Sequence, residues 1–189
     1  LAYRNRGEVD RAIKDYDQAI LLNSNYVLAY YNRGNAYRDK RAYDRAIQNY
    51  DQAIRLDSKY ALAYYDRGVC YFERRDYEKA LQDLAQAIKL DPGFAAALNN
   101  RGNVYQGKGD FERAIADYDR AIKANPHYDV ALNSRGMAFK AKGEMERAVK
   151  DFDQAININA GFALALLNRG ETLEALGYHE RALKDLDQV

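Results

Sequence analysis

The chain repeats itself every 34 residues, and this period restricts its fold more than any other feature of the sequence. Glycine, alanine and isoleucine each recur at that spacing and keep one register from end to end. A fixed period of this length is the signature of architectures in which one supersecondary unit stacks on the next. The series are Gly34, Gly68, Gly102, Gly136 and Gly170; Ala12, Ala46, Ala80, Ala114, Ala148 and Ala182; Ala19, Ala53, Ala87, Ala121 and Ala155; and Ile20, Ile54, Ile88, Ile122 and Ile156.

Each period contains two segments with helical periodicity. In residues 61–74, Ala63, Tyr64, Gly68 and Tyr71 fall on one helical face, and residues 77–90 carry a second apolar face. Turn-forming residues separate the segments, because glycine closes a helix and proline or asparagine stops one. The turns within a period are Gly109-Asp110, Gly143-Glu144 and Gly177-Tyr178, and Asp91-Pro92-Gly93 and Asn125-Pro126-His127 are among those between periods.

This register divides the chain into repeats that together form one continuous domain of about eleven helices. Complete repeats are expected at 27–60, 61–94, 95–128 and 129–162, with partial repeats at 1–26 and 163–189.

Each period resembles the tetratricopeptide repeat. The third complete repeat carries the family pattern, and the first departs from it with Ser58 in place of proline. The resemblance implies an all-α fold, a right-handed superhelical solenoid of antiparallel helix pairs. It also implies that the first helices of successive repeats line a concave, peptide-binding groove. The residues of the third repeat that match are Leu98, Gly102, Tyr105, Ala114, Tyr118, Ala121 and Pro126.

The sequence offers no constellation for catalysis. His127 and His179 lack a second ligand at metal spacing, and Cys70 occupies a slot that alanine or valine fills in other repeats. We therefore expect no catalytic residue, no cofactor and no metal. A net charge of +1 gives no field for attracting nucleic acid, and no apolar stretch is long enough to span a membrane. The compartment stays open, with a cytoplasmic location favoured.

An arginine precedes the glycine in every repeat, at Arg33, Arg67, Arg101, Arg135 and Arg169. Five evenly spaced guanidinium groups are compatible with a ladder that binds an anionic ligand. An acidic series with the same period offers internal partners instead, at Asp15, Asp83, Asp117, Asp151 and Asp185, with Asn49 interrupting it. The internal interpretation is favoured, since arginine pairs with carboxylates through two hydrogen bonds and is costly to bury alone.

Family geometry places five positions of each repeat towards the groove, which becomes tyrosine-rich at one end, amide-rich in the middle and acidic at the other end. Amides donate to and accept from a peptide backbone, and tyrosine supplies flat contact area. The lysines of the clamp that holds chaperone carboxyl-terminal tails are missing, so that partner is disfavoured. The candidate peptide-binding residues are Tyr31, Asn35, Tyr65, Phe72, Asn99, Asn103, Asn133 and Met137.

The sequence therefore predicts a non-catalytic scaffold that binds a protein or peptide ligand in this groove. The alternative is a self-association module that forms homo-oligomers through its end repeats. Its basis is that the last repeat has no successor to cover its apolar side chains. These side chains are Leu173, Leu176, Ala182, Leu183 and Leu186.

Overall fold

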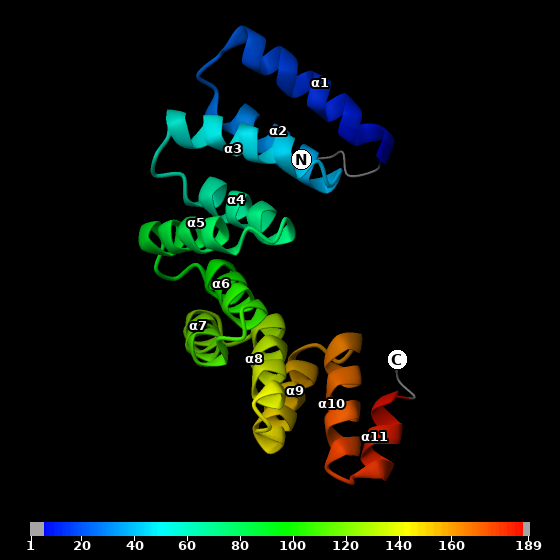
Figure 1. Cartoon of the computed structure of the whole chain (residues 1–189). Helices are drawn as coiled ribbons and strands as arrows, with labels where there is room; N and C mark the ends of the chain where they lie inside the picture. The colour runs from blue at the N-terminus through cyan, green and yellow to red at the C-terminus, as the bar shows by residue number, and fades with distance from the viewer. Residues whose placement is uncertain (1–5, 187–189) are drawn as a thin grey trace. The chain divides into compact units, whose positions relative to one another are not determined.

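The computed structural model describes residues 6–186, and this part of the chain is built of eleven helices without a strand. The all-α repeat architecture predicted from the sequence is confirmed. In chain order the helices are α1 (Arg6–Leu22), α2 (Val27–Asp39), α3 (Tyr43–Leu56), α4 (Ala61–Glu73), α5 (Tyr77–Leu90), α6 (Ala95–Gly107), α7 (Phe111–Ala124), α8 (Asp129–Ala141), α9 (Met145–Ile158), α10 (Ala163–Ala175) and α11 (His179–Leu186) (Figure 1).

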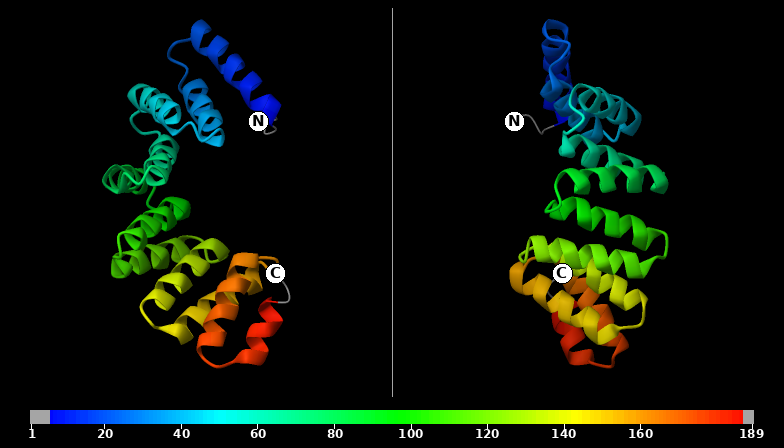
Figure 2. Two further views of the ribbon diagram at one scale, coloured as in Figure 1. Left: turned by 45° about the vertical axis from the view of Figure 1, so that its right-hand side comes forward. Right: turned by 90° about the vertical axis from the view of Figure 1, so that its left-hand side faces the viewer.

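The helices group into two compact units, Leu1–Pro92 and Gly93–Val189. In the first unit α2 pairs with α3 and α4 with α5, while α1 packs on α2. In the second unit the pairs are α6 with α7, α8 with α9 and α10 with α11, and the first helices α6, α8 and α10 are also neighbours (Figure 2). Each pair is an antiparallel hairpin, as the 34-residue period predicts.

The first helix of each hairpin begins at the residue where the sequence analysis starts a repeat, for example at Ala95 for α6. The turn inside each hairpin contains one residue in the left-handed region. Gly109 occupies it with a φ of 78°, but Arg75 occupies the equivalent position with a φ of 60°. Between hairpins, the backbone N–H of Lys59 donates to Oδ1 of Asp57 at 2.9 Å, which forms a local turn after α3.

Glycine lets the two helices of a hairpin approach closely. A Cβ on Gly102 would lie 2.5 Å from Cε1 of Tyr118, and one on Gly34 would lie 2.7 Å from Cε1 of Tyr50. Both tyrosine rings are fully buried together with the alanine series of the second helices. In these two hairpins the core is thus an aromatic ring packed directly against backbone, with small residues around it, whereas Leu84 takes the place of the ring against Gly68.

None of the helices in the described part of the chain has the length and apolar character needed to cross a membrane.

Candidate functional site

The arginine series pairs with the acidic series inside four hairpins, from α4–α5 to α10–α11, whereas Arg33 of α2 binds Asn49. Nε and Nη2 of Arg67 donate to the two carboxylate oxygens of Asp83, both at 2.7 Å. The same two-bond geometry joins Arg101 to Asp117, Arg135 to Asp151 and Arg169 to Asp185. These four aspartates are buried, with at most 6% of their surface exposed. The internal pairing favoured from the sequence is therefore confirmed for these arginines.

A second aspartate, which the sequence analysis missed, accepts a hydrogen bond from Nη1, the remaining guanidinium nitrogen, in most of these arginines. Nη1 of Arg135 donates to Oδ1 of Asp119 at 2.6 Å, from the second helix of the preceding repeat. The pKa of Arg135 is raised, first by its hydrogen bond to Asp151 and then by that to Asp119, against the opposing effect of burial. Equivalent bonds join Arg33 to Asp17, Arg67 to Asp51 and Arg169 to Asp153. The sequence signal that could have predicted these bonds is an aspartate that stands sixteen residues before the arginine.

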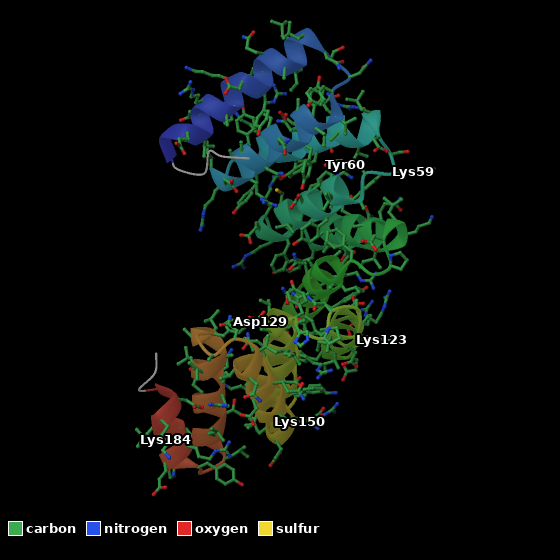
Figure 3. All side chains as sticks on the ribbon, turned by 180° about the vertical axis from the view of Figure 1, so that it is seen from behind. Lys59, Tyr60, Lys123, Asp129, Lys150 and Lys184 are labelled. Atoms are coloured by element: carbon green, nitrogen blue, oxygen red, sulfur yellow. The ribbon has the colours of Figure 1, made fainter. Side chains whose placement is uncertain are left out.

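Among the predicted groove residues of the first unit, Tyr31 is hydrogen-bonded to a buried carboxylate. Its hydroxyl donates to Oδ2 of Asp66 at 2.7 Å, and Arg38 pairs with the other oxygen. Burial raises the pKa of Asp66, although Arg38 and Tyr31 both oppose that shift. The ring centroid of Tyr31 lies 5.0 Å from that of Tyr60. Tyr60 stands in the loop between α3 and α4 (Figure 3). The tyrosine and the acid thus already bind each other across α2 and α4.

Two of the predicted amides accept hydrogen bonds from the core tyrosines. The Tyr50 hydroxyl donates to Oδ1 of Asn35, and the Tyr118 hydroxyl donates to Oδ1 of Asn103, both at 2.8 Å. The structure therefore assigns Asn35 and Asn103 a part in orienting a buried ring, in addition to the predicted contact with a ligand.

Tyr65 and Phe72 lie on α4 and are half-buried. The ring of Phe72 is 5.9 Å from that of Tyr77 on α5, so it also packs within its own hairpin.

The second unit brings the remaining predicted residues together on α6 and α8. Asn99 is 2% exposed, and its Oδ1 has no hydrogen-bond partner in the described part of the chain. Oδ1 of Asn133 accepts a hydrogen bond from Nδ2 of Asn168 on α10 at 2.9 Å. Met137, one turn further along α8, is 40% exposed. Exposed apolar side chains flank these amides at Val130 and Leu164, near the starts of α8 and α10.

Comparisons with known proteins place this arrangement in a family. Models described as the tetratricopeptide repeat match residues 61–94, 95–128 and 130–162, and a model described as the TPR repeat matches 1–40 and 34–73. The chain belongs to the tetratricopeptide repeat (TPR) family. No curated protein sequence matches the chain.

Solved TPR structures resemble the chain over most of its length. The structure of MamA is 30% identical, with a TM-score of 0.75, over 83% of this chain and 92% of that one. YrrB, described as a TPR protein with an unusual peptide-binding site, is 26% identical, with a TM-score of 0.70, over 92% and 89%. PilW, described as a widely conserved type IV pilus biogenesis factor, shares the fold at 20% identity, with a TM-score of 0.86, over 96% and 84%.

The titratable groups in the part of this TPR chain that the structure describes show no grouping suited to metal binding. Within residues 6–186, no three histidine, cysteine, aspartate or glutamate side chains cluster so as to hold a metal ion. Nδ1 of His179 lies 2.9 Å from Oε1 of Glu174 at the surface. Cys70 is fully buried, and this burial raises the pKa of its thiol to about 12. A thiol with such a pKa is a poor nucleophile.

The last hairpin covers part of the apolar face that the sequence analysis expected to be open. Leu173 and Ala182 are each 1% exposed, so that expectation is wrong for these two residues, because packing within the described part of the chain already buries them. Leu176 is half-buried and Leu183 is 60% exposed. The side chain of Leu186 lies outside the described residues.

Proposed function

We propose that this TPR chain is a non-catalytic scaffold that binds an extended peptide segment of another protein on the first helices of its repeats. The observation that carries this proposal is the buried, unpaired Oδ1 of Asn99 on α6. An acceptor buried without a donor costs about 1–3 kcal/mol, so a ligand N–H group that the Asn99 side chain meets by turning outwards relieves that cost. Backbone N–H groups of an extended peptide are such donors.

The surroundings of Asn99 suit the rest of such a ligand. Helix α8, which contacts α6, presents the exposed side chains of Val130 and Met137, and α10, which contacts α8 in turn, presents that of Leu164. An apolar surface beside a small number of polar groups is typical of ligand sites. The description of YrrB as having a peptide-binding site supports the same class of ligand.

Methionine methyl groups provide a direct test, because the chain has two methionines. Met137 lies on α8 beside Asn133, and Met145 begins α9, the other helix of that hairpin. Peptides would be selected against the protein from a random phage-displayed library and titrated into protein carrying ¹³C-methyl methionine. We expect the Met137 signal to shift on peptide binding and the Met145 signal to stay in place.

Asn99→Leu is the matched variant, since Leu167 occupies the equivalent position of the last repeat. Removing one hydrogen bond of about 1 kcal/mol should weaken peptide binding about fivefold. Thermal unfolding should be unchanged or shifted upwards, because the variant also removes a buried unpaired acceptor. Selected peptides that move only Met145, or that bind Asn99→Leu as tightly as the parent, would contradict the proposal.

Self-association is a second candidate, which the exposure of Leu183 on α11 favours. This side chain is 60% exposed, and burying a leucine at an interface contributes about 1.5–3 kcal/mol. Sedimentation velocity at micromolar concentration is expected to show dimers, and Leu183→Lys should return the chain to monomer. A single monomeric species for the parent chain across that concentration range would exclude this candidate.

A further inference from the structure

The charge pattern around Arg101, the arginine of the third complete repeat, differs from that around the other arginines of the series at two positions. Sixteen residues before Arg101 stands Ala85, where four other repeats have Asp17, Asp51, Asp119 and Asp153. Nineteen residues after Arg101 stands Arg120, where the other repeats have Gln18, Gln52, Gln86, Gln154 and Gln188. The repeats around Arg67, Arg135 and Arg169 therefore combine one arginine with two aspartates, whereas the repeat around Arg101 combines two arginines with one aspartate.

The structure shows the consequence of this exchange inside the second compact unit. Arg101 uses Nε and Nη2 to bind the two oxygens of Asp117, at 2.7 and 2.6 Å. Within residues 6–186 its Nη1 has no acidic partner, while the Nη1 of Arg135 has Asp119 at 2.6 Å. The side chain of Arg101 is 17% exposed, so solvent reaches it.

Arg120 adds a second cation to the same carboxylate. Its Nη1 lies 3.6 Å from Oδ1 of Asp117, and its side chain is 49% exposed. Asp117 is buried and already accepts two hydrogen bonds from Arg101, so it balances one of the two guanidinium charges. The other charge and the free donors of both arginines are left for an external anion.

We propose that Arg101 and Arg120 form a binding site for a carboxylate, supplied by an acidic side chain of a partner protein. In four other repeats an aspartate carboxylate occupies the Nη1 position of this arginine, at 2.5 or 2.6 Å, so the geometry is already that of a carboxylate site. Planar guanidinium groups match carboxylates through paired N–H donors. This site shares no residue with the predicted groove, and it goes beyond the function proposed above.

Arginine side-chain resonances test the site directly. The N–H signals of all arginines would be followed in ¹⁵N-labelled protein during titration with acetate, and separately with inorganic phosphate, at constant ionic strength. We expect acetate to shift the signals of Arg101 and Arg120 saturably and to leave Arg135 in place. Arg120→Gln restores the residue of the other repeats and should weaken acetate binding at Arg101 about threefold or more, since one partly exposed charge is lost.

A reciprocal variant provides the matched control within the same unit. Asp119→Ala combined with Gln154→Arg rebuilds the arrangement of the third repeat around Arg135. It should add saturable acetate shifts at Arg135 while those at Arg101 persist. The proposal is overturned if the parent chain shows no selective shift at Arg101, if phosphate binds and acetate does not, or if the double variant gains no response at Arg135. Because none of these measurements involves the groove, failure here leaves the peptide-binding proposal intact.

Discussion

Replacing Arg135 with alanine is expected to lower the free energy of unfolding by about 3 kcal/mol at neutral pH, the lower end of the range for breaking a buried ion pair. The cost arises at Asp151, which is 3% exposed and accepts two hydrogen bonds of 2.7 Å from Arg135. Without the guanidinium, this carboxylate stays buried without a cation. Denaturation with urea, followed by circular dichroism, measures the change.

A double-mutant cycle separates this loss from a general loss of packing. Asp151→Asn reproduces the first repeat, where Nε of Arg33 donates to Oδ1 of Asn49 at 2.7 Å. We expect Asp151→Asn alone to cost about 1 kcal/mol, comparable to one hydrogen bond. In that background Arg135→Ala should cost much less than in the parent chain, because no charge is left buried. Equal costs in both backgrounds would mean that Arg135 acts through its contacts with Phe139 and not through its charge.

The sequence predicts those features of the fold that depend on contacts within one 34-residue period. Gly102 and Tyr118 are sixteen residues apart, and their contact follows from folding two helices onto each other. Arg101 and Asp117 have the same separation and pair for the same reason. Periodicity thus identifies both the close approach of the helices and the ion pair that accompanies it.

The candidate site could be predicted only in part, because spacing assigns a residue to a helix face but does not show which hydrogen bonds its side chain makes. Asn103 lies at a predicted groove position, yet its side-chain oxygen accepts a hydrogen bond from the hydroxyl of Tyr118. Periodicity does not show that the Tyr118 side chain is long enough to reach it. Asn99 and Asn133 occupy equivalent positions of successive repeats, yet their side-chain oxygens differ in hydrogen bonding. Asn168 satisfies Asn133, whereas the oxygen of Asn99 stays unpaired. Such differences depend on the identity of one neighbour in the next repeat.

Replacing Gly102 with alanine is expected to destabilise the chain by about 1–3 kcal/mol, the usual cost of overpacking a core. The new Cβ would lie 2.5 Å from Cε1 of Tyr118, which is closer than carbon atoms pack. The ring has little freedom to move, because its hydroxyl donates to Asn103 at 2.8 Å and lies 2.9 Å from Oε1 of Gln106. Urea denaturation of the variant against the parent chain gives the difference.

Gly68→Ala is the matched control at the same position of the preceding repeat. Its Cβ would meet Cγ of Leu84 at 3.0 Å, a contact that a small shift relieves, and alanine in a helix gains about 0.5–1 kcal/mol over glycine. We therefore expect Gly68→Ala to be nearly neutral. Tyr118→Phe reproduces Phe152 of the next repeat and releases the ring from its hydroxyl bonds. If the anchored ring causes the strain, Gly102→Ala must cost less in the Tyr118→Phe background. An unchanged cost would show that helix backbone, and not the tyrosine hydroxyl, sets the limit on how closely α6 and α7 approach.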